Sequence, residues 1–463
     1  MKARDLVKLG IPSGELTRLA MRLLGPAFAA GKSQKQLVQT LRALAEDPEA
    51  YREDPDFGEL AVALLVQPSA PEPFVERDVP APWHSWGRDL DPKAVGQLRD
   101  ACRLPIAVAG ALMPDAHLGY GLPIGGVLAC EKAVIPYAVG VDIACRMKIT
   151  VLDLPEDTLR GQADRLAGAI EEETRFGVGA AFQKPRDHEV MDEDWNILPL
   201  TRNLKQKARV QLGSSGSGNH FVEFGELVLD RKELGLEPGR YLALLSHSGS
   251  RGPGSAIANH YSKLAMELHP GLPKELQHLA WLDLDSESGQ EYWAAMELMG
   301  RYAAANHAVI HREILRHLGS KSLLSIENHH NFAWKEMHQG REVIVHRKGA
   351  TPAGEGVLGV IPGSMASPAF VVRGKGSVDA IQSASHGAGR VMSRKQAQKS
   401  FTWSAVRKLL ADQGVRLLSA GIDEVPGVYK DIESVMADQV DLVDSLARFH
   451  PRLVKMAPPK KRR

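Results

Sequence analysis

The sequence has few cysteines, and that scarcity limits where the protein works and what stabilises it. Only three occur among 463 residues. An odd, small number in a long chain excludes a disulfide framework and indicates a reducing compartment, so the cytoplasm is the expected location. A thiol in such a compartment is free to act as a metal ligand or a nucleophile.

An excess of charge of either sign is also missing. The chain has 57 Lys and Arg against 56 Asp and Glu, so any site for a polyanion must be a local concentration of charge. No apolar run approaches the roughly 18 residues of a membrane span, and the N-terminus lacks the continuous apolar core of an export signal. We therefore expect no membrane partner.

The N-terminal segment, residues 1–75, is predicted to be a helical extension. Apolar residues recur at steps of three and four in residues 14–30 and 33–48, and Ser33 is placed to cap the second helix. Five prolines in "QPSAPEPFVERDVPAPW" disfavour both helix and central strand. The proline-rich stretch indicates a connector, with a domain boundary near residue 75.

Residues 76–455 have the pattern of one large α+β domain. Short apolar runs broken by glycine, such as "LPIGGVLA", "REVIVHRKGA" and "AFVVRGKG", predict buried strands. Long helices are expected over 291–319 and 393–414, the second opened by a capping box from Ser393 to Gln396. Residues 456–463 form a basic tail that is expected to be disordered; "PPKKRR" also resembles a nuclear-localisation cluster.

Five stretches combine glycine, titratable side chains and strand-like flanks. They are "MPDAHLGYGLPIGG" (113–126), "VGVDIACRM" (139–147), "LGSSGSGNHFVEF" (212–224), "LLSHSGSRGPGS" (244–255) and "IENHHNFAWKE" (326–336). Glycine-rich loops let backbone N–H groups approach an anion. Each stretch taken alone is also compatible with an ordinary loop.

Together these stretches offer ligands for one or two divalent cations. Val139 and Val141 predict a strand that ends before Asp142, and a turn there would bring Asp142 and Cys145 to one point. A buried structural cysteine is the alternative. Loop histidines add imidazoles, and a thiolate with imidazoles favours zinc by ligand chemistry. The spacing of these residues is not diagnostic of a metal site.

The stretch "QSASHGAGRVMSR" places His386 among small residues. So little bulk would admit a large charged group such as a nucleotide phosphate. Arg390 and Arg394 lie four apart at an expected helix start, where both could favour an anion. The alternative is a glycine-rich turn that carries a surface histidine.

These motifs, with "HRKGATPAGEGVLGVIPGSM" and "VPGVYKDIESV", occur in the same order as those of the RtcB-type RNA ligases, and the resemblance runs from about Trp83 to Lys455. It implies an RtcB-like catalytic domain and a GTP- and manganese-dependent ligase. Such an enzyme joins RNA ends that bear a 3′-phosphate or a 2′,3′-cyclic phosphate to 5′-hydroxyl ends, in tRNA splicing or RNA repair. An archease-type activating partner is also implied.

The resemblance assigns roles to individual residues. Cys145 would bridge two manganese ions, one also held by Asp142 and His220 and the other by His247 and His330, which like the family's ligand directly precedes an asparagine. His386 would attack the α-phosphate of GTP and hold GMP. The implied nucleotide contacts are Asn219, Glu223, Gly363, Ser364, Ser385, Gly387, Tyr429 and Lys455, and the residues matched to metals, phosphates or RNA are Asp115, Arg251 and Arg390.

Some features depart from the commonest family form. Ala144 and Arg146 stand where the family usually has Asn and Gly, and Arg146 could add a charge or crowd the metals. The N-terminal extension and the tail could adjust RNA choice. These departures would suit a family branch that repairs damaged RNA. The second hypothesis is a metal-dependent 2′,3′-cyclic phosphodiesterase that does not join ends. The third is an RNA-binding scaffold, which would be expected to have lost some of these ligands.

Overall fold

The computed structural model describes residues 3–12, 15–65 and 74–458. Parts of the predicted connector and of the predicted tail lie outside the described residues. The described chain divides into two compact units. One contains the residues up to Phe74 together with His269–Gly271, and the other contains Val75–Leu268 and the residues from Leu272 onward.

The N-terminal unit is helical, as its periodicity predicts. Its helices are α1 (Ala3–Lys8), α2 (Glu15–Ala29), α3 (Gln34–Glu46), the 3₁₀ turn Glu49–Tyr51 and α4 (Gly58–Leu65). The N-cap prediction is confirmed, because the Ser33 hydroxyl accepts from the Gln36 amide and the Gln36 side chain accepts from the Ser33 amide. The buried face of α3 carries Leu37, Leu41 and Leu44.

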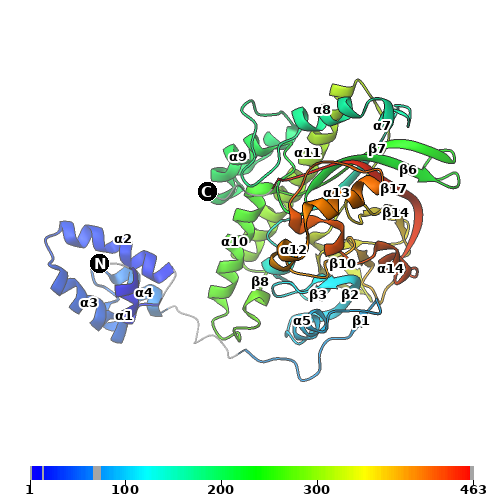
Figure 1. Ribbon diagram of the computed structural model, residues 1–463. Helices are drawn as coiled ribbons and strands as arrows, with labels where there is room; N and C mark the ends of the chain where they lie inside the picture. Colours follow the sequence, from blue (N-terminus) through cyan, green and yellow to red (C-terminus); the bar gives the residue numbers. More distant parts are fainter. Residues whose placement is uncertain (1–2, 13–14, 66–73, 459–463) are drawn as a thin grey trace. The chain divides into compact units, whose positions relative to one another are not determined.

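The second unit mixes sheets and helices, as predicted (Figure 1). Its large sheet has the order β13-β14-β17-β6-β7-β5-β9, with β16 added beside β17. The strands are β5 (Arg146–Leu152), β6 (Phe221–Leu229), β7 (Gly239–Ser248), β9 (Ser322–His329), β13 (Leu358–Ile361), β14 (Ala369–Gly374), β16 (Arg416–Ser419) and β17 (Val443–Met456).

A second sheet has the order β1-β2-β3-β11-β10, and two pairs, β12-β15 and β4-β8, complete the strands. Their bounds are β1 (Trp83–Ser85), β2 (Ala107–His117), β3 (Ile124–Cys130), β4 (Ala133–Val134), β8 (Leu282–Asp283), β10 (Asn331–His338), β11 (Arg341–Lys348), β12 (Ala350–Pro352) and β15 (Ser383–Ser385). The helices are α5 (Pro92–Cys102), α6 (Pro136–Val139), α7 (Thr158–Gly161), α8 (Ala163–Glu173), α9 (Pro199–Gln211), α10 (Arg251–Leu268), α11 (Glu287–Leu318), α12 (Arg394–Ser400), α13 (Trp403–Asp412) and α14 (Ile432–Ala437).

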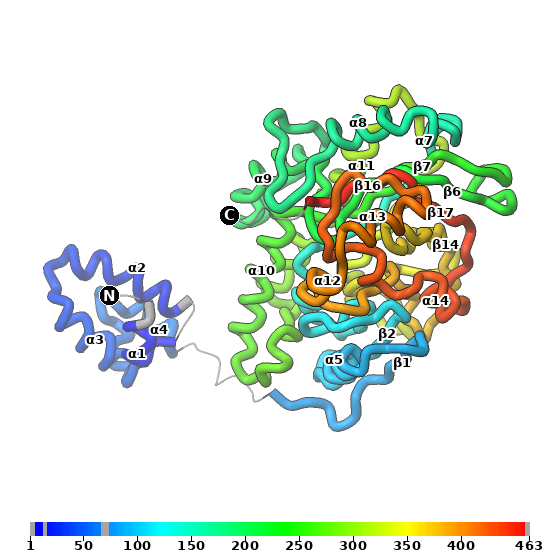
Figure 2. The backbone as a smooth tube through the Cα atoms, viewed as in Figure 1, coloured from blue at the N-terminus to red at the C-terminus, as the bar shows by residue number. Residues whose placement is uncertain are grey.

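Helices cover one face of the large sheet. Leu166 and Ile170 of α8 pack with Ile310 and Ile314 of α11 against side chains of β6 and β7. The opposite face is filled by residues from β5, β7, β14 and β17. The last strand, β17, is red in Figure 2 and runs between β14 and β6, far from both in sequence. Both faces of the central strands are therefore buried, which matches their continuous apolar runs.

The two long helices differ from the prediction at their ends. α11 begins four residues earlier than expected, because Ser286 caps it by accepting from the Gly289 amide, and it ends at Gly319, which has a φ of 59°. The expected helix over 393–414 is two helices, because Phe401 and Thr402 are extended and start a new helix at Trp403. Ser393 caps α12 by accepting from the Gln396 amide.

The strand directions bring four loops to one edge of the large sheet. β5 and β6 each pair antiparallel with β7, and β9 pairs antiparallel with β5. The starts of β5 and β6 therefore meet the ends of β7 and β9. This edge carries "VGVDIACRM", "GSGNHF", "SHSGSRG" and "ENHHNF", four of the stretches singled out in the sequence.

Candidate functional site

At this edge four side chains converge although they lie far apart in sequence. Cys145 directly precedes β5, His220 directly precedes β6, His247 lies near the end of β7 and His330 follows β9. The Cys145 Sγ is 3.4 Å from the His220 Nε2 and 3.1 Å from the His247 Nε2. The Nε2 atoms of His247 and His330 are 3.2 Å apart. All four side chains are buried.

Asp142 completes the cluster, with its Oδ2 2.8 Å from the His220 Nε2. The ligand atoms form two overlapping triads, Cys145 with His247 and His330, and Asp142 with Cys145 and His220, and the atoms of each triad lie within 4.8 Å of one another. Cys145 is the member that they share. Each triad has the donor types that a metal ion binds.

Backbone hydrogen bonds turn the imidazoles toward the cluster. The Nδ1 of His220 lies 2.9 Å from the Ser215 carbonyl oxygen, and the Nδ1 of His247 lies 3.0 Å from that of Asn219. A carbonyl can only accept, so the Nδ1 of His247 carries the proton and its Nε2 presents a lone pair. Burial lowers the pKa of His247 to about 3 and that of His330 well below its usual value. These rings are therefore neutral, as metal ligands must be.

The remaining donors complete a chemically consistent metal site. Burial, with the nearby Asp142 charge, raises the pKa of the Cys145 thiol. Burial also acts to raise the pKa of Asp142, but His220 and Arg251 outweigh it, so that carboxylate stays ionised. A buried thiol needs a cation to become a thiolate, and this site supplies places for one. The residues present therefore fit a metal centre, and their softness alone would favour zinc.

The turn that carries Asp142 and Cys145 differs from the sequence prediction. Residues before it form the short helix α6 (Pro136–Val139) rather than the end of a strand, because Pro136 starts a helical turn and Gly140 ends it at a φ of 95°. The Ala144 amide donates to the Asn331 carbonyl oxygen over 2.7 Å, and Ala144 has a φ of 55°. The strand begins only at Arg146.

A glycine of "SHSGSRG" is required by the position of Asp142. A Cβ on Gly249 would lie 2.3 Å from the Asp142 Oδ1. Any larger residue would therefore displace the carboxylate from the cluster. This close approach gives a steric reason for glycine at this position of the motif.

His386 lies beside the cluster. It follows β15, which pairs with β12, and its Nδ1 is 2.6 Å from the Oδ2 of Asp115, a fully buried carboxylate of β2. Its ring centroid is 4.9 Å from that of His330. The His386 side chain is 14% exposed, so it is not the surface histidine of the alternative interpretation. The carboxylate orients the ring, so the Nε2 is free to react.

The small residues around His386 also serve a purpose other than admitting a ligand. A Cβ on Gly389, at a φ of 74°, would lie 2.1 Å from the Asp115 carbonyl oxygen. Gly389 therefore lets the loop approach the strand whose carboxylate holds His386. Gly387 is less crowded, with its nearest neighbour, the Pro362 carbonyl oxygen, 3.3 Å from a built Cβ.

The two arginines after His386 contact the same carboxylate but do not lie on the same helix. Arg390 precedes α12 and forms a β-bridge with Tyr429, whereas Arg394 is the first residue of α12. Both pair with the buried carboxylate of Glu424, and the Tyr429 hydroxyl donates to it as well. In this structure their charge is used on Glu424 rather than left free for an anion.

The remaining residues matched to nucleotide contacts lie on several elements. Glu223 of β6 is buried, and burial raises the pKa of its carboxyl well above the usual range. The buried Ser385 hydroxyl has no hydrogen-bond partner in the described part of the chain. Lys455 of β17 pairs with Glu171, and Asn219 is exposed. Gly363 and Ser364 form a turn after β13, where the Ser364 and Ser367 hydroxyls are 2.8 Å apart.

Two arginines flank the cluster. Arg251, the first residue of α10, donates from Nε to the Ser214 hydroxyl over 3.2 Å and acts on the Asp142 carboxylate through its charge. Arg146, one of the departures, is buried and pairs with Glu327 of β9 over 2.9 Å. Its charge is therefore paired with Glu327, while it also lies close enough to Cys145 for the two to interact electrostatically.

Sequence reasoning missed two residues of α11 that form hydrogen bonds with the loops of the site. The buried Asn306 of α11 accepts from the Gly213 amide over 2.7 Å and donates to the Ser214 carbonyl oxygen over 2.9 Å and to the Ser248 hydroxyl over 3.1 Å. The adjacent His307 lies 3.1 Å from the Ser248 carbonyl oxygen. Asn306 stands in a long helical pattern without glycine neighbours, so only its position as a polar residue on a buried helix face could have indicated this role.

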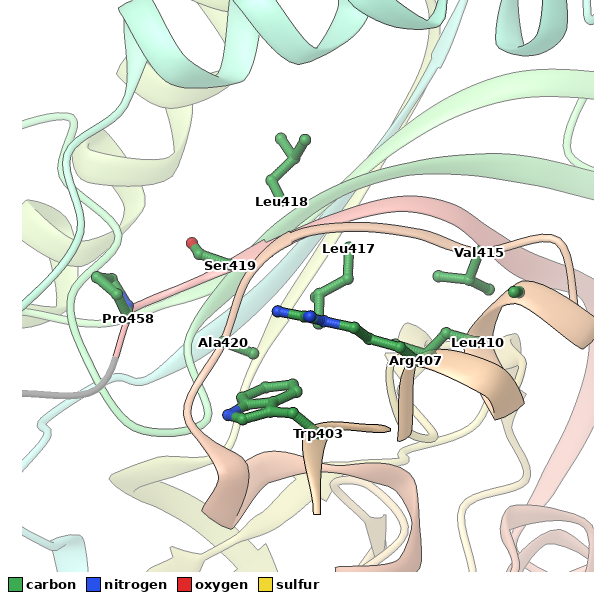
Figure 3. Close-up of a pocket in the computed structure, with 10 residues that line it drawn as sticks. Trp403, Arg407, Leu410, Val415, Leu417, Leu418, Ser419, Ala420 and Pro458 are labelled. Atoms are coloured by element: carbon green, nitrogen blue, oxygen red, sulfur yellow. The ribbon is translucent and has the colours of Figure 1, made fainter. Parts of the chain in front are cut away.

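A separate pocket of about 370 Å³ lies between α13, β16 and Pro458 (Figure 3). Trp403, Arg407 and Leu417 are among the residues that line it. None of the predicted site residues lines this pocket. The cluster around Cys145 and His386 is therefore the better candidate for chemistry.

Comparison with known proteins places the chain among proteins with assigned names. The sequence model described as tRNA-splicing ligase RtcB matches residues 97–198 and 196–456. The RNA-splicing ligase RtcB of Escherichia coli (strain K12) is 35% identical over 404 residues, which cover 79% of this chain and 94% of that protein. The tRNA-splicing ligase RtcB of Thermococcus kodakarensis is 30% identical over 414 residues, covering 73% and 86%. The RNA-splicing ligase RtcB of Mycobacterium bovis is 32% identical over 429 residues, covering 77% and 98%.

The fold and these similarities define the class of protein, an enzyme of the RNA ligase type. The chain belongs to the RtcB family of tRNA-splicing ligases. Among the described residues, no helix has the length and apolar character needed to cross a membrane.

Proposed function

We propose that this enzyme joins RNA ends bearing a 3′-phosphate or a 2′,3′-cyclic phosphate to 5′-hydroxyl ends, using GTP and two manganese ions. The observation that carries the proposal is the placement of His386, oriented by Asp115 and next to the Cys145 cluster. A nucleophile beside two potential cation sites suits phosphoryl transfer, in which charge on the phosphoryl oxygens must be neutralised. Manganese rather than zinc follows from the family, because the donor set alone does not select it.

His386 would act first. Its Nδ1 is held by Asp115, so its Nε2 lone pair attacks the α-phosphorus of GTP, a P–N bond forms and pyrophosphate leaves with the electrons of the broken P–O bond. Asp115 stabilises the positive charge that develops on the ring. The GMP then passes to the RNA 3′-phosphate, and the 5′-hydroxyl oxygen displaces GMP to form the phosphodiester. A cyclic end must first be opened by water.

The five ligands would hold the cations that support these steps. Asp142, Cys145 and His220 would hold one, and Cys145, His247 and His330 the other. When bound, these ions neutralise phosphoryl oxygens. Arg251, beside His220 and Asp142, adds a fixed positive charge to the same region.

The nucleotide contacts are proposed from the family resemblance, and the chemistry of two of the side chains supports them. The buried Ser385 hydroxyl and the protonated Glu223 carboxyl can each donate a hydrogen bond. Tyr429 and Lys455 would be released from Glu424 and Glu171 to contact the nucleotide. The Gly363–Ser364 turn, Asn219 and Gly387 complete the proposed nucleotide set, and Arg390 is assigned to phosphate or RNA.

A labelling experiment tests the covalent step. Purified protein is incubated with GTP labelled in the α-phosphate and with Mn²⁺, and protein-bound label is measured after denaturation. We expect label that is stable in alkali and labile in acid, as a phosphoramidate is, and none in His386→Ala. Label on His386→Ala, or none on the wild type, would contradict the proposal. Normal labelling of Cys145→Ala would contradict the bridging role of Cys145.

A joining assay separates the leading function from its alternative. RNA with a 3′-phosphate and RNA with a 5′-hydroxyl are supplied together, and the joined product is expected to require GTP. End opening of a 2′,3′-cyclic phosphate without joining would instead identify a cyclic phosphodiesterase. Hydrolysis of a cyclic end needs no covalent nucleotide intermediate, so an imidazole oriented by Asp115 to act as a nucleophile favours joining.

The cellular setting is part of the same proposal. Cys102, Cys130 and Cys145 are free thiols, which suits a reducing compartment such as the cytoplasm. Substrates from tRNA splicing or from RNA repair fit the chemistry equally well. Adding an archease-type protein to the joining assay would show whether turnover requires an activating partner.

A further inference from the structure

Three aromatic rings form a group in which one ring is exposed and two are partly buried. Tyr120 lies in the loop between β2 and β3 and is 69% exposed. Its ring stands edge-on to that of His278 at 5.6 Å and to that of Tyr137 at 6.4 Å, and the rings of Tyr137 and His278 are 4.4 Å apart. We call these three residues the aromatic shelf. Tyr137 and His278 therefore contact the Tyr120 ring, most of which remains open to solvent.

The loop that carries the shelf is tied to the catalytic residues. It leaves β2 two residues after Asp115, which holds His386. The Lys348 ammonium donates to the Tyr120 carbonyl oxygen, and the next residue, Gly349, donates from its amide to the His330 carbonyl oxygen over 2.8 Å. A Cβ on Gly349 would lie 3.1 Å from the His386 Cε1. The segment Lys348–Gly349 therefore connects the loop of the shelf to His330 and to the proposed nucleophile, His386.

The chemistry of the shelf suits a base and a phosphate. Lys348 lies 5.4 Å from the centre of the Tyr137 ring and has no carboxylate partner in the part of the chain that the structure describes. The His278 Nδ1 is buried and likewise has no hydrogen-bond partner among the described residues. Leu118, in the same loop, is also exposed. An exposed aromatic ring with a lysine close by is a combination that single-stranded nucleic acid recognition uses.

We propose that the aromatic shelf stacks on a nucleobase of the RNA strand whose 3′-phosphate lies at His386. Tyr120 presents the stacking face, and Tyr137 and His278 hold it in place. This assignment rests on the proposed function, since it needs an RNA end at His386. Stacking is tolerant of base identity, because every base has a π-face. The shelf therefore positions the strand near its end without selecting one sequence.

The test measures RNA binding without chemistry. A fluorescein-labelled single-stranded RNA with a 3′-phosphate is titrated with protein in the absence of GTP, and the dissociation constant is read from anisotropy. The same RNA is prepared with an abasic nucleotide at each of the three terminal positions in turn. Wild type is compared with Tyr120→Ala, with Tyr120→Phe and with Tyr241→Ala, a tyrosine at the far end of β7 that donates to the Glu237 carbonyl oxygen.

We expect Tyr120→Ala to bind the intact RNA about tenfold more weakly than wild type, within the range measured for loss of one stacked base. Tyr120→Phe, which keeps the ring, and Tyr241→Ala should bind as wild type does. One abasic RNA should bind wild type and Tyr120→Ala equally, because the base that stacks is missing. If Tyr120→Ala binds the intact RNA normally, or loses the same factor with every abasic RNA, the stacking assignment is wrong.

The GTP-labelling experiment distinguishes a failure of the stacking proposal from a failure of the proposed ligase function. Wild-type protein should take up label from GTP without RNA. If wild type is not labelled but shows the base-dependent loss at Tyr120, the ligase proposal fails and the shelf remains a base-binding site. If wild type is labelled and Tyr120 has no effect on binding, only the shelf is overturned.

Discussion

Single residues near the site are held at a cost in stability. Lys348 is buried without a carboxylate partner in the described part of the chain, and burial lowers its pKa from 10.5 to about 7. Each pKa unit corresponds to about 1.4 kcal/mol, so keeping this ammonium in the fold costs a few kcal/mol. Stability alone would not select a lysine there, which fits a residue placed to face an anionic substrate.

The substitution Lys348→Met tests this cost. Because the pKa of Lys348 is lowered in the folded protein, the unfolded chain binds more protons between pH 7 and pH 10.5. The loss of folding stability caused by the buried lysine is therefore complete below pH 7 and disappears as the pH rises to 10.5. We expect Lys348→Met to raise the free energy of unfolding at pH 7, with an advantage that shrinks toward pH 10. Urea denaturation at both pH values measures it. An advantage that does not change with pH would contradict the argument.

Ala144 is also held at a cost in stability, because its backbone is strained. A residue other than glycine in the left-handed region destabilises the fold by about 1–2 kcal/mol. Glycine removes this strain, but the greater entropy of its unfolded chain offsets about 0.5–1 kcal/mol of the gain. At its φ of 55°, Ala144→Gly should therefore raise the free energy of unfolding by roughly 0.5–1 kcal/mol. The control Ala256→Gly, inside α10, should lower it by about 1 kcal/mol. Equal effects of the two substitutions would refute the strain assigned to Ala144.

At the scale of elements, the site depends on a helix that contributes no proposed ligand. α11 holds the loop 213–215 and the end of β7 through Asn306. The same loop accepts the proton of the His220 Nδ1 at Ser215. Loss of such an outer hydrogen bond changes metal affinity without touching a ligand.

We predict that Asn306→Leu binds Mn²⁺ about 10- to 100-fold more weakly than wild type. Leucine has a similar volume but leaves the Gly213 amide without its acceptor and removes one of the donors to the Ser214 carbonyl oxygen. Isothermal titration with Mn²⁺ measures the change, and Asn259→Leu on the exposed face of α10 is the matched control. Unchanged affinity in Asn306→Leu would show that α11 does not position the ligands.

The elements also show how far sequence reasoning reaches. The glycine-flanked motifs identified the loops that meet at the sheet edge, because alternating strand directions bring such loops together. The local conformation before Asp142 was missed, since Val139 and Val141 read as a strand while Pro136 and Gly140 impose a short helix. The break at Phe401 and the support from Asn306 were missed too, because both depend on tertiary packing that no local pattern carries.

At the scale of the whole molecule, the two units have separate hydrophobic cores. The core of the N-terminal unit includes Leu6, Leu24, Leu41 and Phe57 and draws on residues before Leu65 alone. The residues matched by the RtcB family lie in the other unit. The resemblance predicted the second unit's architecture well but carried no information on the first.

We expect a protein that begins at Phe74 to keep the fold of the second unit and its labelling by GTP. Calorimetry of the full chain should show two unfolding transitions, and the truncated protein should show one of them at an unchanged temperature. A truncated protein that fails to fold, or one transition in the full chain, would show that the cores are not independent.

The central claim is that Cys145 bridges two cations in front of His386. Anomalous diffraction from a crystal soaked in Mn²⁺ tests it directly. The account predicts two manganese peaks on either side of the Cys145 Sγ, one next to Asp142 and His220 and the other next to His247 and His330. A single peak, or peaks away from Cys145, would contradict it.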